Sequence, residues 1–213
     1  MMTALVRKTF SVPPLGCNCS IIADPITKQA VVIDPGGAPE RILREVEQLG
    51  CTVSHILHTH AHLDHFLASS EIKKATGAVI CLHQDDLQLW NNLELQCRVF
   101  GVSYVPALPP DHWLADEEKV MLGQVPIVAI HTPGHTPGSI SFYLPDDKLV
   151  LAGDTLFRGS IGRTDLWGGN YETIEESIRE RLYTLDDSTL VITGHGPDTE
   201  IGVEKEMNQF VRA

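Results

Sequence analysis

Short runs of β-branched and apolar residues, punctuated by proline and glycine, alternate along this chain with stretches of helical periodicity. Such runs predict strands, because β-branched side chains suit a pleated surface and Pro, Gly and Asp favour turns. The predicted strands are 5–12, 20–23, 30–34, 53–57, 79–82, 119–122, 125–130, 139–144, 148–152 and 189–193. We expect the first three to pair as consecutive antiparallel strands.

Apolar residues three and four positions apart predict helices between these strands. The segment 39–49 shows this spacing, and Gly50 follows it where a C-terminal cap belongs. Further helices are predicted at 66–75, 84–90, 172–182 and 198–210. The segment 91–110 has no clear period and contains three prolines. It is therefore either a loop or flap over a site or an ordinary surface connection.

The second half of the chain repeats the order of the first, several strands followed by a helix, without a sequence repeat or a linker. Amphipathic helices and strands of this kind bury their apolar faces by stacking in layers. We expect residues 1–213 to form a single α+β domain. Its predicted architecture is a four-layer αβ/βα sandwich, with two facing sheets and helices on the outside.

Composition narrows the classes of function. The chain of 213 residues is 43% hydrophobic, and its formal net charge of −12 leaves the basic residues scattered. Nucleic acid is a poor partner, because a phosphate backbone requires a concentrated basic face. The N-terminus lacks the pattern of a secretory signal, and no apolar run approaches the roughly 20 residues that span a bilayer. We expect a cytoplasmic protein without a membrane partner.

The five cysteines are an odd number without the spacing of a disulfide scaffold, so reduced thiols are expected. Cys17 and Cys19 lie two positions apart on a predicted strand and face the same side. They are either a metal-binding pair or ordinary packed strand cysteines.

The most unusual stretch of the sequence is 59–65, directly after the predicted strand 53–57. It contains His60, His62, Asp64 and His65, four metal-binding side chains within six residues. A solvated polar loop is the alternative, but charged imidazoles crowded in this way would repel one another. Nitrogen and oxygen donors together favour zinc or iron over calcium and magnesium, which prefer oxygen alone.

Three more donors, His135, Asp154 and His195, each follow a predicted strand on a turn that contains glycine. Loops at one end of a sheet commonly carry functional sites, because the strands fix their positions. One such histidine alone would more often be structural. The shared placement of all three predicts that they join the loop 59–65 in a metal site.

In these motifs the sequence resembles the metallo-β-lactamase superfamily, whose signature is His-x-His-x-Asp-His followed by a His, an Asp and a final His. The resemblance covers nearly the whole chain and implies the same sandwich fold. It also implies two metal ions, the first held by His60, His62 and His135 and the second by Asp64, His65 and His195, with Asp154 bridging them. Asp34 matches an early aspartate of the family.

Within the superfamily, the aspartate at position 154 resembles the residue that the hydrolase and glyoxalase branch carries there, whereas zinc-dependent lactamases usually carry cysteine at that position. His62 differs from the glutamate of the flavodiiron branch. The segments 162–166 and 132–138 resemble those of glyoxalase II-type proteins, the hydroxyacylglutathione hydrolases. The chain resembles a short form without the helical C-terminal region that supplies glutathione contacts in full-length members.

This resemblance implies a hydrolase acting on a small thioester, with glutathione as a candidate thiol. Two divalent ions, zinc first and iron or manganese as alternatives, would lower the pKa of a bridging water from about 15.7 to about 7. A thiolate, with a pKa of about 8.5, leaves without a strong general acid. Asp64 is expected to orient the resulting hydroxide.

Two other functions remain open at this stage. The segment 162–165 is also similar to that of persulfide dioxygenases, which would use a single iron held by His60, His135 and Asp154 on glutathione persulfide. A metal-binding interaction module without activity is the third hypothesis. It is less favoured because the chain keeps every ligand position.

Three further residues have open roles. Asp34 either accepts a hydrogen bond from a ligand histidine, as such supporting partners do, or caps the turn 35–37. His58 is either a structural residue or, as the histidine nearest the site, a support for the ligands. Arg163 either binds a substrate carboxylate or pairs with Asp165 or Asp64 and holds its loop.

Overall fold

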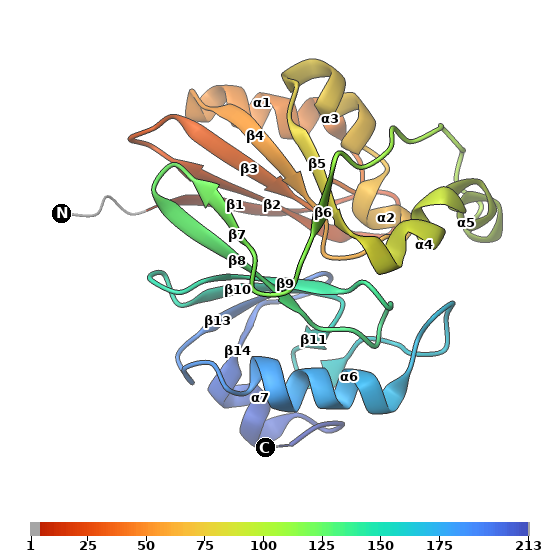
Figure 1. Ribbon diagram of the computed structural model, residues 1–213, viewed down its shortest axis with the longest axis vertical. Helices are drawn as coiled ribbons and strands as arrows, with labels where there is room; N and C mark the ends of the chain where they lie inside the picture. The colour runs from red at the N-terminus through yellow and green to blue at the C-terminus, as the bar shows by residue number, and fades with distance from the viewer. Residues whose placement is uncertain (1–4, 213) are drawn as a thin grey trace.

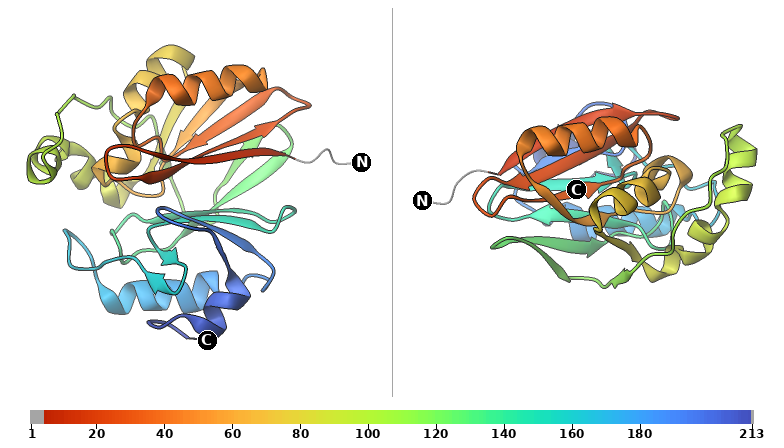
Figure 2. Two further views of the ribbon diagram at one scale, coloured as in Figure 1. Left: turned by 180° about the vertical axis from the view of Figure 1, so that it is seen from behind. Right: turned by 90° about the horizontal axis from the view of Figure 1, so that it is seen from above.

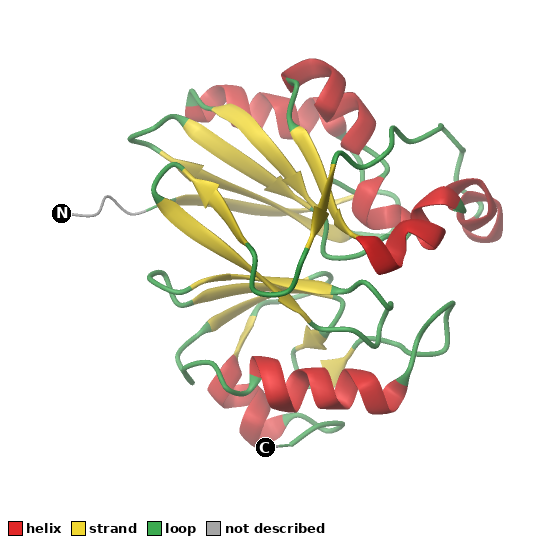
Figure 3. Ribbon diagram, viewed as in Figure 1, coloured by secondary structure: helices red, strands yellow, loops and turns green. Residues whose placement is uncertain are grey.

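The computed structural model describes residues 5–212, in which two mixed sheets face each other between outer helices (Figures 1 and 3). The first sheet has six strands in sequence order. They are β1 (Val6–Val12), β2 (Cys17–Asp24), β3 (Gln29–Ile33), β4 (Thr52–Leu57), β5 (Val79–His83) and β6 (His112–Leu114). The strands β1, β2 and β3 are antiparallel, as predicted, and β3 to β6 are parallel.

The second sheet also has six strands, in the spatial order β14-β13-β10-β9-β8-β7. They are β7 (Lys119–Leu122), β8 (Val125–His131), β9 (Ile140–Leu144), β10 (Leu149–Gly153), β13 (Leu190–Thr193) and β14 (Thr199–Glu200). The one parallel pair, β10 with β13, brings the carboxyl ends of these two strands to the same edge. The strands β11 (Leu156–Phe157) and β12 (Ser160–Ile161) form a separate two-stranded sheet.

Helices cover both outer faces (Figure 1). The first sheet is covered by α1 (Pro39–Leu49) and α3 (Ser69–Thr76), as Figure 2 also shows. The second is covered by α6 (Tyr171–Ser177), its π-helical continuation η2 (Ile178–Leu182) and α7 (Ile201–Met207). At one end lie α2 (Leu63–Phe66), η1 (Gln84–Asp86), α4 (Leu87–Asn91) and α5 (Leu93–Phe100). The predicted αβ/βα sandwich is confirmed.

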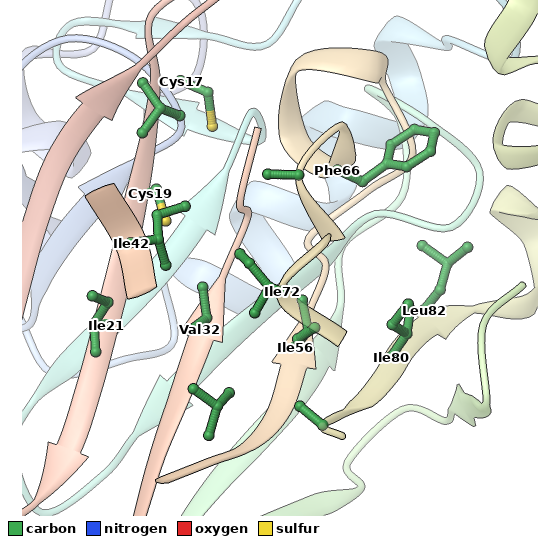
Figure 4. Close-up of a cluster of buried hydrophobic side chains, with 14 of the residues drawn as sticks. Cys17, Cys19, Ile21, Val32, Ile42, Ile56, Phe66, Ile72, Ile80 and Leu82 are labelled. Atoms are coloured by element: carbon green, nitrogen blue, oxygen red, sulfur yellow. The ribbon is translucent and has the colours of Figure 1, made fainter. Parts of the chain in front are cut away.

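Alternation along the strands divides the core into three layers. In β2, Ile21 faces the helices while Ile22 faces the opposite sheet, and in β10 Val150 and Leu151 divide in the same way. Figure 4 shows the layer beneath α1 and α3, where Ile42 and other buried side chains pack on the first sheet. A period of two therefore lets each sheet bury both of its faces.

Local signals predicted several elements closely. The helix α1 spans the predicted residues, and Gly50 ends it in the left-handed conformation, with φ 62°. Glycine reaches this conformation without the steric cost that a Cβ imposes. The five cysteines are free, as expected, and Cys17 and Cys19 pack together in the core beneath α1.

Two predicted segments were wrong in their structure. The helix expected at 66–75 is divided into α2 and α3, because the Ala68 amide donates to the carbonyl of Pro35, 3.0 Å away, across the fold. The segment 91–110 is not irregular throughout, since it contains α5. Leu93, Gln96 and Cys97 anchor this helix by burial.

No helix among residues 5–212 combines the length and apolar character needed to cross a membrane. The cytoplasmic location expected from the sequence stays a prediction.

Candidate metal centre

The seven candidate ligands meet at one end of the sandwich. His60, His62, Asp64 and His65 lie just beyond the carboxyl end of β4 and in the adjoining α2. The others come from the second sheet: His135 from the β8–β9 connection, Asp154 after β10 and His195 after β13. Because the sheets face each other, residues that are 131 positions apart in sequence, Asp64 and His195, become neighbours.

Three histidines form one part of the cluster. His62 Nδ1 lies 2.9 Å from His135 Nε2. One nitrogen from each of His60, His62 and His135 lies within 4.8 Å of the other two. Converging imidazole nitrogens at this spacing are the donor set of a zinc or iron site.

The second part joins an aspartate with two histidines. His195 Nε2 is 3.1 Å from Asp64 Oδ2, and His65 Nε2 is 3.8 Å from the same oxygen. Asp154 stands between the two parts, with its Oδ1 3.5 Å from His65 Nε2 and its Oδ2 3.6 Å from His135 Nε2. One carboxylate therefore reaches both groups of ligands.

Unpartnered buried atoms show that the residues fit a cation. Among the described residues, His60 Nε2, His65 Nε2 and Asp154 Oδ1 have no hydrogen-bond partner although each atom is buried. Leaving a buried polar atom unpaired costs about 1–3 kcal/mol. A bound cation would satisfy all three, so the cluster is a metal-binding His/Asp site.

The charge states also favour a cation. Burial and the neighbouring histidines hold the pKa of His60 well below its usual range, and burial lowers the pKa of His62 to about 3. Burial opposes ionisation of Asp64, but His65 and the hydrogen bond from His195 outweigh it and lower the pKa of this carboxyl. At neutral pH His60 and His62 are therefore unprotonated and Asp64 is a carboxylate, which are the ligand forms that metals require. Burial also opposes ionisation of His65 and His195, but Cys17 and the neighbouring carboxylates raise the pKa of His65, and Asp64 and Asp154 raise that of His195.

Asp34 fixes the orientation of two ligand histidines. Its Oδ2 accepts a hydrogen bond of 2.6 Å from the Thr59 hydroxyl and lies 3.0 Å from His65 Nδ1. The Thr59 oxygen, with its proton directed at Asp34, is free to accept one from His60 Nδ1 at 3.1 Å. Both Nε2 atoms are then left with lone pairs, in the arrangement typical of metal-bound histidine.

His135 is oriented in a similar way by the chain itself. Its Nδ1 lies 2.7 Å from the carbonyl oxygen of Arg163, which can only accept a proton. The lone pair of His135 is therefore on Nε2, the nitrogen that faces His62 and Asp154. The backbone of the loop between β12 and α6 thus takes part in building the site.

Two buried residues that the sequence analysis missed hold the ligand loops. Asp86 accepts hydrogen bonds from the Ala61 amide at 2.8 Å, the Thr136 hydroxyl at 2.8 Å and the Gly138 amide at 2.7 Å. It thereby ties the loop of His60 and His62 to the loop of His135. No sequence motif marks Asp86, which lies 50 residues from Thr136 in the chain.

Gln96, from α5, is the other such residue. Its side-chain oxygen accepts from the Leu63 amide at 2.9 Å, and its nitrogen donates to the carbonyl of Ala61 at 3.1 Å. These bonds clamp the loop that carries His62 from the outside. The signal was hidden because the segment 91–110 lacked a recognisable helical pattern.

The two remaining candidates, Arg163 and His58, contact residues other than the candidate metal ligands. Arg163 makes a two-point ion pair with Asp165, with its Nε 2.7 Å and its Nη2 2.8 Å from the two carboxylate oxygens. His58 is buried, 3.1 Å from the Ser69 hydroxyl and edge-on to the Phe66 and Trp90 rings. Its supporting role therefore stays a prediction.

The ligands open onto a cavity of about 150 Å³. Besides metal-site residues it is lined by Leu15, Leu63, Phe100, Arg163 and Leu166. The entrance is therefore apolar, apart from the Arg163 guanidinium. A small carbonyl compound that enters it would meet His62, His135, Asp154 and His195 at its floor.

Comparisons with known proteins agree with this geometry. The model of the metallo-beta-lactamase superfamily matches residues 12–195. Hydroxyacylglutathione hydrolase GloC of Haemophilus influenzae is 40% identical over 198 residues, which are 92% of this chain and 93% of that protein.

Two solved structures are each 34% identical to this chain. BLEG-1 B3 metallo-beta-lactamase has a TM-score of 0.90 and covers 98% of this chain and 100% of its own. TTHA1623 in a di-iron-bound form has a TM-score of 0.88, and the match covers 96% of this chain and 100% of that chain.

Proposed function

The chain belongs to the metallo-β-lactamase superfamily, and from that premise we propose that it is a metal-dependent hydrolase of small hydroxyacyl thioesters, of which S-lactoylglutathione is the type. The observation that carries the proposal is the position of Asp154, whose two oxygens reach both groups of ligands. The similarity to GloC supports a thioester as the bond that is cleaved.

The site is proposed to hold two divalent ions. His60, His62 and His135 would hold one, Asp64, His65 and His195 the other, and Asp154 would contact both. The di-iron form of TTHA1623 supports this number. Zinc, iron and manganese all accept histidine and carboxylate ligands, so we propose zinc first with the other two as alternatives.

The reaction would add water to the thioester carbonyl and break the carbon–sulfur bond, giving a carboxylate, a thiol and a proton. The bound ions would supply a Lewis acid and a hydroxide at neutral pH. Asp64, which is in contact with His195, would orient the nucleophile and relay its proton. Leu15, Phe100 and Leu166 would restrict the access of other solvent to the reacting carbonyl.

A second candidate is a persulfide dioxygenase that uses a single iron. Its support is the segment 162–165, which resembles that branch, and the closeness of His135 to Asp154, whose Nε2 and Oδ2 are 3.6 Å apart. The two candidates differ in metal stoichiometry and in whether oxygen is consumed.

Metal analysis and activity of the same purified preparation would test the proposal. We expect about two ions per chain, hydrolysis of S-lactoylglutathione, and loss of both after Asp154→Asn. The control His112→Ala alters a half-exposed histidine that pairs with Glu118 on the β6 edge, and it should change neither. One iron per chain with oxygen consumption on glutathione persulfide would favour the dioxygenase. Hydrolysis of the β-lactam nitrocefin with thioesters left intact would instead favour a lactamase.

A further inference from the structure

A larger cavity of about 370 Å³ opens beside the metal cleft, and nothing in the metal chemistry requires it. In Figure 1, α4 and α5 and the loop between β12 and α6 project at the same end of the molecule. Side chains from these segments line the cavity, among them Leu89, Leu95 and Trp167, together with Pro137 from the β8–β9 connection. Its volume is within the roughly 300–1,000 Å³ typical of ligand pockets.

The cavity and the metal cleft are lined by different residues of the same two segments. On α5, Leu95 lines the cavity and Phe100 lines the cleft. On the β12–α6 loop, Trp167 lines the cavity and its neighbour Leu166 lines the cleft. A molecule whose carbonyl lies at the metal ligands therefore has an adjacent space for a substituent.

One side of the cavity, formed by Gly168 and Pro137, is closely packed. Gly168 lies so close to Pro137 that a Cβ at this position would be 2.7 Å from the proline Cδ. Its φ of +81° also favours glycine. Pro137 is two residues beyond His135 and follows the loop held by Asp86. The cavity is therefore fixed relative to the metal ligands.

Apolar side chains at the cavity are unusually open to solvent. Trp167 is 43% exposed and Leu95 is 38% exposed. Covering such surface with an apolar ligand is favourable by about 25 cal/mol per Å². A concave site with an exposed indole is a typical place for an apolar group.

The charges at the cavity disfavour an anionic occupant. Of the described residues that line the cavity, Asp85 alone is charged. The Arg163 side chain is the one Lys or Arg that lines the neighbouring cleft, and it is already paired with Asp165. The two carboxylates of a glutathionyl group would find no free cation here.

We propose that this cavity is the subsite for an apolar, uncharged group of the thioester substrate, with Trp167 as its principal wall. The inference rests on the proposed thioesterase function and narrows its substrate class. Thioesters with an aliphatic or aromatic substituent should be preferred over those whose groups beyond the carbonyl are all small or anionic.

Hydrolysis of a homologous series tests the preference in the metal-loaded full chain. The probes are acetyl, butyryl and hexanoyl thioesters of N-acetylcysteamine, which is an uncharged thiol. We expect kcat/KM to rise by about threefold for each added methylene, mainly through KM. Trp167→Ala should flatten the series, whereas Trp113→Ala, which removes an equally exposed tryptophan on β6, should leave it unchanged.

Binding of the non-hydrolysable thioether S-hexyl-N-acetylcysteamine provides a readout that does not depend on turnover. At about threefold per methylene, its five additional methylenes should make it bind about 200-fold more tightly than the S-methyl compound, and Trp167→Ala should remove the difference. Equal binding of the two thioethers, or a flat series alongside rapid hydrolysis of S-lactoylglutathione, would overturn the subsite and leave the thioesterase intact. Tight S-hexyl binding without hydrolysis of any thioester would support the subsite and refute the thioesterase.

Discussion

The two sheets contribute to the metal centre in different ways. The first sheet supplies four of the candidate ligands within six residues, on a loop whose backbone and side chains are held by Asp34, Asp86 and Gln96. The second sheet supplies three ligands singly, from three separate loops. Two of its three side chains are also more open: the His195 side chain is 30% exposed and that of Asp154 14%, whereas His65 is fully buried and His135 is 3% exposed.

This difference suggests that the first-sheet loop fixes the metal-binding geometry, whereas the second sheet contributes two ligands that are more open to a substrate. Buried hydrogen bonds that fix a ligand before the metal arrives reduce the reorganisation needed for binding. The first-sheet loop therefore provides a prearranged base. Asp154 and His195 of the second sheet are the more exposed to the cleft, so substitutions on the two sides should differ in their effects.

The largest effect is expected from His60→Ala, which removes a fully fixed ligand from the base. Loss of the Lewis acid that it holds costs several kcal/mol, so kcat/KM should fall by about 10³-fold, together with the metal content. Elemental analysis and thioester kinetics would measure both. Full activity at an unchanged metal content would show that His60 is not a ligand.

Asp86→Ala should have the next largest effect, on stability as well as on metal binding. It leaves the Ala61 and Gly138 amides and the Thr136 hydroxyl without their buried acceptor. Each unsatisfied group costs about 1–3 kcal/mol, so the free energy of unfolding should fall by about 3 kcal/mol or more. Urea denaturation would measure the loss. Asp85→Ala, at the adjacent exposed position, is the matched control and should stay within about 0.5 kcal/mol.

Asp34→Asn should weaken metal binding while the fold is kept. The amide can still accept from the Thr59 backbone, but it removes the negative charge that faces His65 Nδ1. We expect a loss of about 10–100-fold in metal affinity. Competition with a chromogenic chelator would quantify it. Unchanged affinity would mean that the Asp34 side chain serves the loop alone.

The smallest effect is expected from Arg163→Ala on the second-sheet side. The guanidinium is exposed and already paired with Asp165, and the carbonyl that orients His135 remains in the variant. The KM for S-lactoylglutathione should therefore change by less than about fivefold. Steady-state kinetics would decide between the two roles. A larger increase, absent with uncharged thioesters, would assign Arg163 to a substrate carboxylate.

Much of the architecture was predictable because its causes are local. The helix α1 and its end at Gly50 follow from apolar spacing and from the freedom of glycine. The break between α2 and α3 was not predictable, because it depends on a hydrogen bond from Ala68 to Pro35, more than 30 residues away. The helix α5 was missed for a similar reason, since the buried Gln96 interrupts its apolar pattern while binding a distant loop.

The sequence by itself determined which side chains could bind a metal, because ligand chemistry belongs to residue types and the motif at 59–65 concentrates them. It also determined the layered fold, since alternation and helical spacing specify which faces are buried. Only the tertiary structure decided how these parts act together: that Asp154 reaches both ligand groups, that Asp86 joins their loops, and that Trp167 lines a cavity beside them. These are distances between segments far apart in the chain, and packing of the two sheets sets them.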